Sequence, residues 1–319
     1  MHDVTAIGEL LIDFATINED EDGYPTMAAK PGGAPGNYLA ALAEYGISTA
    51  LLAKVGDDSF GKKLINTIEK AGIATSGIVL DNTAFTTLAF VTFDDKGDRS
   101  FSFARKPGAD ILLRWDEIKR SLIEEARVFH FGTLSLTDEP IRGTTQKSVM
   151  YAKEKGKIIT FDPNLRKPLW RSSEEAKEQI LWGLTQADIV KISDEEVSFL
   201  WDCSIQEGTD ILLEQYGVKL AMITLGPDGC HLQNKNGSIY VKSPPVKTVD
   251  TTGAGDIFGG AAVSRILKKG KLPEELTLDD LQDVAMFATH AASLSTEKMG
   301  GIPSIPPEEK VIQAIQRAY

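Results

Sequence analysis

Asp250-Thr251-Thr252-Gly253-Ala254-Gly255-Asp256 is the stretch of this sequence that says most about how the chain folds. Shortly before it, Pro244 and Pro245 favour an extended backbone. After it, apolar residues recur at helical spacing from Ile257 to Leu267, which predicts a helix. The glycines therefore lie where a turn becomes a helix. At that point the first backbone N–H groups have no partner within the helix and attract an anion.

The acid that ends this stretch gives the predicted anion site a chemical role. Gly253, Ala254 and Gly255 leave the backbone bare, so an anion could approach it closely. Asp256 adds a carboxylate at the same place, which is unfavourable in a site that only holds phosphate. It suits a site where a hydroxyl loses its proton while negative charge develops beside it. The structural alternative is a glycine-rich turn followed by an ordinary helix-start acid.

Composition and charge argue against several classes of protein. The 319 residues carry a formal net charge of −12, with 42% apolar and 25% charged residues, as in ordinary globular proteins. The negative charge disfavours nucleic acid and anionic membranes as partners. Cys203 and Cys230 form no metal or disulfide pattern, and no apolar run is long enough to cross a membrane. No signal peptide is evident after Met1, so we expect a cytoplasmic protein.

Strand-like and helix-like segments alternate along the chain, which predicts an α/β fold with a mostly parallel sheet. The segment from Val4 to Phe14 is expected to form one buried strand ending near Asp13. In open α/β sheets the carboxyl ends of strands face the ligand crevice, so Asp13 is a candidate site residue. Further strands are expected at 49–55, 128–131, 158–161, 189–192 and 220–225, and helices at about 115–125, 139–155, 173–183, 208–216 and 279–296. We expect a single domain over residues 1–319.

Two segments interrupt this alternation and predict a small β-sheet beside the main one. Residues 15–31 are polar and contain a turn, and residues 86–107 hold two strand-like runs joined by Asp94 to Asp98, a hairpin signal. Such a sheet could act as a lid that closes over a substrate and excludes water. Arg105, near the end of the second segment, is a candidate to reach the crevice. An exposed edge of the lid is also a candidate surface for a homodimer.

Polar residues next to other predicted elements are further candidates. Gly33 and Asn37 lie in a glycine- and proline-rich loop before a helix, where the backbone can approach a ligand and the amide can bond a polyol. Asn164 and Arg166 follow the strand expected at 158–161, again at a carboxyl end.

Two charged segments have competing interpretations. Lys191 and Glu196 could order a metal and phosphates, although acids at a helix start more commonly only complement the helix dipole. Residues 56–63 come close to a phosphate-binding P-loop. We reject that interpretation because Lys63 stands where Ser or Thr is needed, and Asp57 and Asp58 would lie among the phosphates. We expect this segment to begin a helix instead.

Several motifs together give the sequence a resemblance to the ribokinase-like (pfkB) carbohydrate kinases from end to end. The motifs are Gly8–Phe14, Pro31–Asn37, Phe161–Arg166, Val190–Glu196 and Asp250–Asp256. Residues 32–61 and 246–259 resemble the two family signatures, and within the family the set is most similar to the fructokinases. The resemblance implies a ribokinase-like three-layer sandwich with a mostly parallel central sheet and a small β-sheet lid. It also implies ATP-dependent phosphorylation of the primary hydroxyl of D-fructose to fructose 6-phosphate, with 2-keto-3-deoxygluconate, ribose or a nucleoside as alternative acceptors.

The resemblance also implies roles for individual residues. Asp256 would take the proton from the sugar hydroxyl, while N–H groups of Gly253, Ala254 and Gly255 hold the transferring phosphoryl group. The residues expected to hold the sugar are Asp13, Gly33, Asn37, Arg105, Asn164 and Arg166. Those expected around ATP and Mg²⁺ are Lys191, Glu196 (acting on the metal through water), Thr224, Gly226, Gly229 and Thr289. Those expected around a K⁺ ion are Asp250, Thr252, Ser295, Gly300 and Ser304. The family often has Asn at the position of Ser193, so no direct role is carried over to Ser193.

Two functions of other classes are compatible with parts of the sequence. Gly253-Ala254-Gly255 begins a dinucleotide-like glycine pattern, as in nicotinamide oxidoreductases. That pattern needs an acid at the end of the next strand, whereas here a loop at 269–273 follows the helix. A non-catalytic sugar sensor on the same fold is the third option, because a fold alone does not specify activity. The presence of Asp256 beside a complete anion site argues against it.

Overall fold

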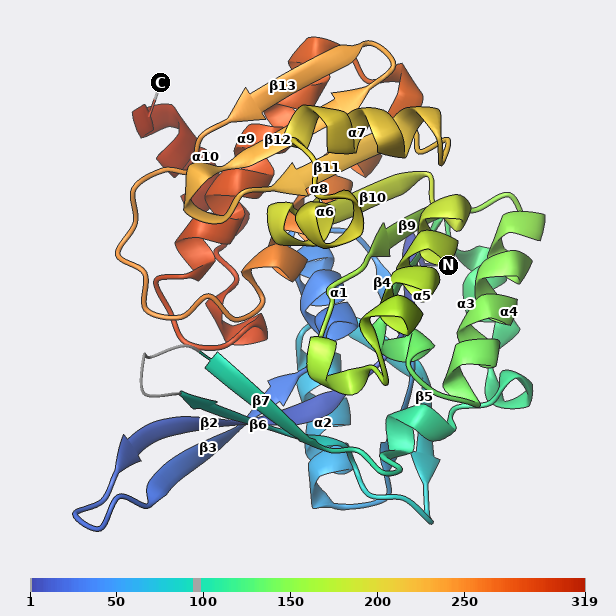
Figure 1. Ribbon diagram of the computed structural model, residues 1–319, viewed down its shortest axis with the longest axis vertical. Coiled ribbons are helices and arrows are strands. Elements are labelled where there is room, and N and C mark those ends of the chain that lie inside the picture. Colours follow the sequence, from blue (N-terminus) through green and yellow to red (C-terminus); the bar gives the residue numbers. More distant parts are fainter. Residues whose placement is uncertain (1, 94–98, 319) are drawn as a thin grey trace.

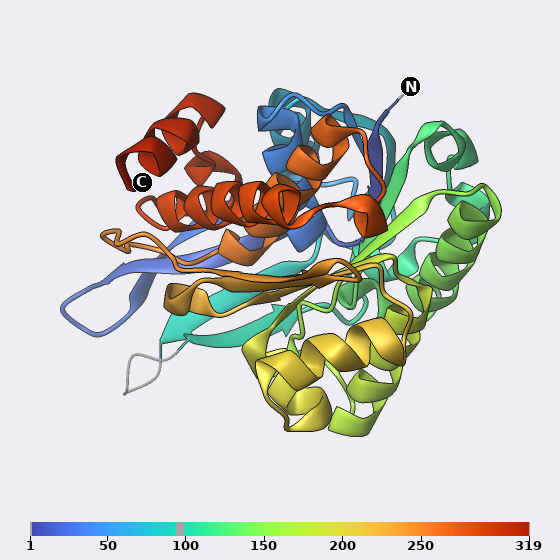
Figure 2. The same ribbon diagram turned by 90° about the horizontal axis from the view of Figure 1, so that it is seen from above.

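The protein, a computed structural model that describes residues 2–93 and 99–318, has a nine-stranded central sheet between two layers of helices (Figures 1 and 2). Neighbouring strands in this sheet are parallel, except at one edge. There the last two strands each run antiparallel to their inner neighbour. In spatial order the strands are β13 (Gly237–Val241), β12 (Cys230–Asn234), β11 (Leu220–Thr224), β10 (Ile189–Ser193), β9 (Ile158–Asp162), β8 (Val128–Gly132), β1 (Val4–Ile7), β4 (Thr49–Gly56) and β5 (Ile73–Asp81).

Apolar side chains on both faces of the sheet explain the two helical layers, because a sheet buried on both faces needs apolar residues pointing in both directions. On β9, for example, Ile159 and Phe161 pack with one layer, and Ile158 packs with the other. One layer consists of α3 (Arg120–Glu125), α4 (Ile141–Glu154), α5 (Ser173–Gln186), α6 (Asp194–Trp201) and α7 (Ile205–Glu214). The other consists of α1 (Ala34–Glu44), α2 (Ser59–Lys70), α8 (Ala254–Lys269), α9 (Leu278–Ser295) and α10 (Glu308–Ala318).

A second sheet of four strands projects from one end of the central sheet (Figure 1). In spatial order it contains β3 (Pro25–Gly32), β2 (Leu11–Glu19), β6 (Leu88–Phe93) and β7 (Arg99–Ala104). We call these four strands the lid sheet. β6 and β7 lie within residues 86–107, whereas β2 and β3 span residues 11–32, a wider range than the expected 15–31. The predicted turn at Asp94 to Asp98 lies outside the described residues.

The single strand expected from Val4 to Phe14 is wrong. The chain forms β1 in the central sheet, leaves it at Gly8, and continues as β2 in the lid sheet. Gly8 permits this exit because a Cβ there would lie 2.6 Å from Cγ of Pro35, closer than atoms can pack. Asp13 is therefore a residue of the lid sheet and not of the end of a central strand.

Most other predicted elements are present, with two kinds of difference. The helix expected at 115–125 is a 3-10 turn at Trp115–Glu117 followed by the short α3. Strands β5 and β13 were not predicted, because both lie at sheet edges and mix buried with exposed residues. Within residues 2–93 and 99–318, no helix has the length and apolar character of a membrane span.

The segment at 56–63 begins a helix, as expected. The carboxylate of Asp58 accepts hydrogen bonds from the backbone N–H groups of Phe60 and Gly61, at 2.9 Å each, and so caps α2. The ammonium of Lys62 pairs with the Asp57 carboxylate at 2.8 Å, with both side chains about half exposed. This is a solvated helix start and not a phosphate cradle.

Candidate active site

Helix α8 begins at Ala254 with a bare N-terminus. Its N-cap residue, Gly253, has φ of +77°, which favours glycine, and no side chain caps the helix. A Cβ at Gly253 would lie 2.9 Å from Cα of Gly301 and 3.1 Å from Nδ2 of Asn37, so the surrounding chain also needs glycine here. The N–H of Ala254 donates to the carbonyl of Thr251 at 3.2 Å, and no side chain caps the other N–H groups of the first turn. A helix start without a side-chain cap suits an anion.

Two cavities meet at this helix start. We call the first, of about 620 Å³, the lid-side cavity, and the second, of about 700 Å³, the α9-side cavity. Thr251 and Gly255 line both of them. A group bound at the N-terminus of α8 can therefore be reached from either cavity.

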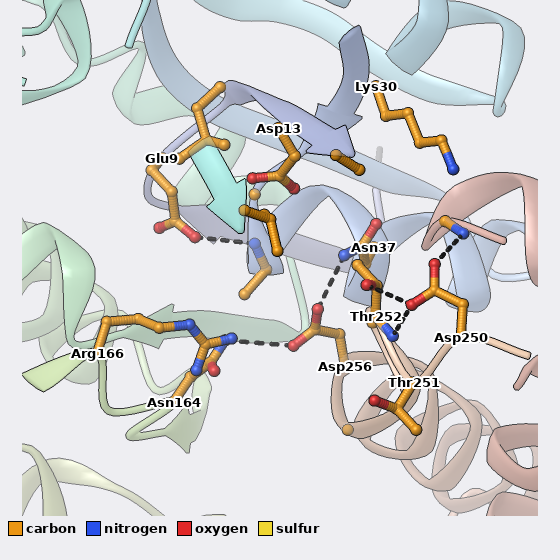
Figure 3. Close-up of a pocket in the computed structure, with 18 of the residues that line it drawn as sticks. Glu9, Asp13, Lys30, Asn37, Asn164, Arg166, Asp250, Thr251, Thr252 and Asp256 are labelled. Atoms are coloured by element: carbon orange, nitrogen blue, oxygen red, sulfur yellow. Dashed lines mark hydrogen bonds between the residues drawn. The ribbon is translucent and has the colours of Figure 1, made fainter. Parts of the chain in front are cut away.

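Asp256 faces the lid-side cavity and is held by two amides. Nδ2 of Asn37, on α1, donates to Oδ2 of Asp256 at 2.9 Å. From the other side, Nδ2 of Asn164, in the loop after β9, donates to Oδ1 at 3.3 Å (Figure 3). Burial raises the pKa of Asp256, while the bond from Asn37 and the nearby charges of Lys191 and Arg166 oppose that rise. The carboxylate is oriented and desolvated, as a general base should be.

The opposite wall of the lid-side cavity comes from the lid sheet and the loop after it. Asp13 points into the cavity from β2, and burial raises its pKa to about 6 against the charge of Arg166. Gly33 has φ of +117°, and a Cβ there would lie 2.5 Å from the carbonyl oxygen of Glu9. The structure thus brings Asp13, Gly33, Asn37, Asn164, Arg166 and Asp256 to one cavity, as the sequence predicted.

A buried ion pair lies beneath the start of α8. The Nζ of Lys191 on β10 is 3.1 Å from Oδ2 of Asp162, the last residue of β9. Lys191 lines the lid-side cavity, and a Cβ at Gly255 would lie 2.8 Å from its Nζ. Burial opposes the positive charge, but Asp162, Glu196 and Asp256 outweigh it and raise the pKa of Lys191. The ammonium is therefore charged and lies against the helix start.

Glu196 adopts the helix-start role that was the alternative interpretation. Its Oε2 accepts from the N–H of Ser193 at 2.8 Å, and the Ser193 hydroxyl accepts from the N–H of Glu196, which is a capping box on α6. Oε1 accepts from the N–H of Leu165 at 2.7 Å. Glu196 lines neither cavity in the described structure. Its carboxylate keeps lone pairs that could accept from a metal-bound water, but nothing shows direct metal binding.

The α9-side cavity contains the residues expected around a nucleotide. Thr224, Gly226 and Gly229 line it from the end of β11, and Thr289 lines it from α9. Sequence reasoning missed Ala292, Ser293 and Thr296, which continue the same face of α9. Their spacing from Thr289 is three, four and seven residues, so helical periodicity could have found them. The extended segment Pro244–Val246 forms another wall.

The residues proposed for a monovalent cation come from the loop before α8, the last residue of α9 and the connection that follows α9. Oδ1 of Asp250 accepts from the N–H and hydroxyl of Thr252 at 3.0 and 2.7 Å, and Oδ2 accepts from the N–H of Gly300 at 2.8 Å. The hydroxyls of Ser295 and Ser304 each donate to a carbonyl three residues earlier. Among the described residues, no cluster of three or more His, Cys, Asp or Glu side chains could hold a metal. Any cation here would depend on backbone carbonyls.

Arg105 differs from its expected position. It is 5% exposed and does not line the lid-side cavity. Its guanidinium contacts the Asp110 carboxylate at 2.7 Å and donates to the hydroxyl of Thr137 at 2.8 Å and the carbonyl of Leu134 at 3.0 Å. These contacts attach the end of β7 to the segment that follows β8 in the central sheet. The position of Arg105 in the sequence does not predict them.

Three charged residues of the lid-side cavity were not predicted as site residues: Glu9, Lys30 and Lys167. Glu9 is 4% exposed, and its Oε1 accepts from the N–H of Ala34 at 2.8 Å, at the start of α1. Lys30 lies on β3 opposite Asp13 and lines the same cavity (Figure 3). A Cβ at Gly300 would lie 3.9 Å from Cδ of Lys30. Glu9 belongs to a motif that the sequence analysis used, but nothing local distinguishes it from an ordinary loop acid.

Comparison with known proteins agrees with this geometry. The sequence profile of the pfkB family carbohydrate kinases matches residues 1–308. This chain belongs to the pfkB family. It is 41% identical over 321 residues to fructokinase-1 of Zea mays, an alignment that covers 99% of this chain and 98% of the relative.

Solved structures of the family also align over the full length of the chain. A fructokinase of Xylella fastidiosa with bound ATP superposes with a TM-score of 0.91 at 29% identity, covering 100% of this chain and 99% of that one. A putative ribokinase II of E. coli, with ATP and Mg²⁺, gives 0.87 at 27% identity and covers 99% and 100%. A fructokinase double mutant of Vibrio cholerae with fructose, ADP and potassium gives 0.87 at 28%, covering 99% and 98%.

Proposed function

We propose that this member of the pfkB family is a fructokinase, which transfers the γ-phosphoryl group of ATP to the primary hydroxyl of D-fructose and forms fructose 6-phosphate. The observation that carries the proposal is Asp256, held by two amides at the point where the two cavities meet. The choice of fructose is supported by the full-length similarity to fructokinase-1 of Zea mays and to the two bacterial fructokinases.

In this proposal the sugar occupies the lid-side cavity and ATP the α9-side cavity. Asp256 accepts the proton of the sugar hydroxyl as the sugar oxygen bonds to the γ-phosphorus. The bond between that phosphorus and the β–γ bridging oxygen breaks, and its electron pair stays on ADP. The N–H groups of Gly253, Ala254 and Gly255 donate to the transferring group, where charge must be stabilised. Asp13, Gly33, Asn37, Asn164 and Arg166 hold the sugar.

The metal assignments belong to the same proposal. Mg²⁺ usually keeps several waters and binds to substrate phosphates and few carboxylates, which fits a chain without a dedicated metal cluster in its described part. Glu196 would contact such an ion through water, and when bound the ion neutralises phosphate charge. The connected loops around Asp250 and Gly300 would hold K⁺, as the potassium in the Vibrio relative suggests.

A coupled ADP-release assay over a panel of sugars, with and without K⁺, tests the function. The panel contains fructose, ribose, 2-keto-3-deoxygluconate and a nucleoside. We expect fructose to give the highest kcat/KM and K⁺ to increase it. A roughly tenfold preference for another sugar, which corresponds to about 1.4 kcal/mol, would reassign the substrate while leaving a sugar kinase. No ADP release with any sugar would favour a non-catalytic sensor.

We also propose that the free edges of the lid sheet, β3 and β7, support a homodimer, since unpaired strand edges favour association. Light scattering of the purified protein at several concentrations tests this. A monomer at every concentration would contradict it.

A further inference from the structure

Three strands of the central sheet turn polar beneath the start of α8. On β8, β9 and β10 the face towards α1 and α8 carries His130, Thr160, Asp162 and Lys191, all buried. The Nδ1 of His130 lies 3.0 Å from Oγ1 of Thr160, so these two polar groups satisfy each other. Lys191 and Asp162 are the charged members of the group and lie at its end nearest Gly255.

A structural ion pair alone does not explain the position of Lys191. A buried lysine needs one carboxylate partner, which Asp162 provides at 3.1 and 3.3 Å. Lys191 also lines the lid-side cavity, and it approaches the backbone of Gly255 so closely that a Cβ there would lie 2.8 Å from Nζ. Burying a positive charge at this place is costly, and a hydrophobic pair of similar volume would stabilise the fold equally well.

The Lys191 ammonium lies beside Gly255, at the helix start where the proposed function places phosphoryl transfer. During transfer, negative charge is spread over the oxygens of the moving group while its bond to ADP breaks and its bond to the sugar forms. A fixed positive charge with little water around it stabilises such a group more than solvent does. Gly255 has no side chain to separate this site from the Lys191 ammonium.

We propose that Lys191 is a charge-stabilising residue for the transferring phosphoryl group, acting with the N–H groups of α8, and that Asp162 is the positioning residue that holds its ammonium there. This inference rests on the proposed function, since it assumes phosphoryl transfer at Asp256. It assigns Lys191 to the reacting group and not to general nucleotide binding, and it gives a role to Asp162.

Three variants separate this role from simple charge neutralisation: K191M, D162N and the double variant K191M/D162N. We expect K191M to lower kcat roughly 10²-fold, the usual effect of removing one donor to a developing anion, with KM values for sugar and ATP changed less than about threefold. The double variant should fold, because it removes both charges together, and it should stay as slow as K191M. D162N should lower kcat less than K191M does, because the positive charge of Lys191 remains. K191R should recover part of the rate.

A second measurement does not depend on turnover. ADP with Mg²⁺ and aluminium fluoride mimics the transferring group, and its affinity can be compared with that of ADP and Mg²⁺ alone by calorimetry. We expect K191M to lose at least about tenfold in affinity for the fluoride complex and little for ADP, because only the mimic carries the additional charge. Lys54 provides a control, since it is a buried lysine that pairs with Asp81 at 3.0 Å and with Glu117 at 2.7 Å, away from both cavities. K54M should weaken the fold without changing either measurement.

Recovery of kcat in K191M/D162N to within about threefold of wild type would overturn the inference, because Lys191 would then only neutralise Asp162. A folded K191M with unchanged kcat and unchanged fluoride affinity would also overturn it. Failure of the proposed function gives a different result, which is seen in the wild type. If the wild type prefers another sugar, the kinetics of the same variants are measured with that sugar. If the wild type turns over no sugar, the affinities for the aluminium fluoride complex test the role of Lys191.

Discussion

Asp256 is held at the residue scale by two amides from distant parts of the chain, Asn37 and Asn164. Both carboxylate oxygens are engaged, so the side chain cannot turn freely towards solvent. Burial raises its pKa, which makes it a stronger proton acceptor than an exposed aspartate once it is ionised.

We expect Asp256→Asn to lower kcat by roughly 10² to 10⁴, the usual contribution of a general base. An amide cannot accept the proton of the sugar hydroxyl, yet its oxygen can still accept from Asn37. ATP binding should survive, because Asp256 does not line the α9-side cavity, where we propose that ATP binds. Steady-state kinetics and nucleotide calorimetry check both parts. A folded variant with near-normal kcat would refute the role of Asp256.

Glu9 predicts a pH dependence of stability. Burial raises its pKa from 4.5 to about 7, so between these values the folded protein binds a proton that the unfolded chain has released. Stability contributed by this group is therefore present at pH 4.5 and lost as the pH rises to 7. Glu9→Gln keeps an acceptor for the Ala34 N–H without the charge. The free energy of unfolding of this variant, relative to that of wild type, should increase by up to about 3 kcal/mol from pH 5 to pH 8, at ~1.4 kcal/mol per pKa unit.

Urea denaturation of both proteins at the two pH values measures this difference. An equal difference between variant and wild type at pH 5 and pH 8 would show that Glu9 does not bind a proton in the folded protein in this range.

At the scale of elements, α8 has glycine in the left-handed region at both ends. Gly253, the N-cap, has φ of +77°, and Gly270, the C-cap, has φ of +66°. A Cβ at Gly253 would meet Gly301 and Asn37, whereas nothing lies within 4 Å of a Cβ at Gly270. The two ends therefore have a similar backbone conformation but different surroundings.

We expect Gly253→Ala and Gly270→Ala each to destabilise the fold by about 1–2 kcal/mol, the cost of a left-handed alanine. Only Gly253→Ala should also lower kcat, by about tenfold to a hundredfold, because shifting Asn37 or the first turn misplaces the reacting groups. Thermal unfolding and kinetics of the two variants check this. Similar kcat losses in both would mean that activity follows overall stability and not the geometry of the N-terminus.

At the scale of the whole molecule, the lid sheet joins the central domain through buried polar contacts. Arg105 follows β7 directly, and its guanidinium reaches Asp110, Thr137 and Leu134. These contacts connect the end of the last lid strand to the segment that follows β8 in the central sheet. They hold the lid in position above the lid-side cavity, where Val91 and Phe103 from the lid form part of the wall.

We expect Arg105→Met to destabilise the protein by roughly 3–5 kcal/mol, because it leaves the Asp110 carboxylate buried without its charged partner. Arg105→Met combined with Asp110→Leu should recover most of that loss. Urea denaturation measures both, and sugar KM in the double variant should stay near that of wild type. A large rise in sugar KM in this stable variant would indicate that Arg105 contributes to sugar binding.

The sequence by itself was sufficient for the local features of this protein. The string from Asp250 to Asp256 predicted a bare helix start with an acid, because caps, glycines and helical periodicity act over a few residues. The alternation of strands and helices predicted the parallel sheet for the same reason. Most of the residues that the resemblance to a family then assigned line one of the two cavities.

Only the tertiary structure decided which distant groups meet. Asn37 and Asn164 both reach the carboxylate of Asp256 because of the spatial order of the strands, which local patterns do not specify. The exit of the chain at Gly8, which moves Asp13 into the lid, needs a residue without a Cβ because Pro35 lies against it. The ion pairs of Arg105 and Lys191 depend on partners brought together by packing. Charge interactions act through space, so their partners become known only when the chain has folded.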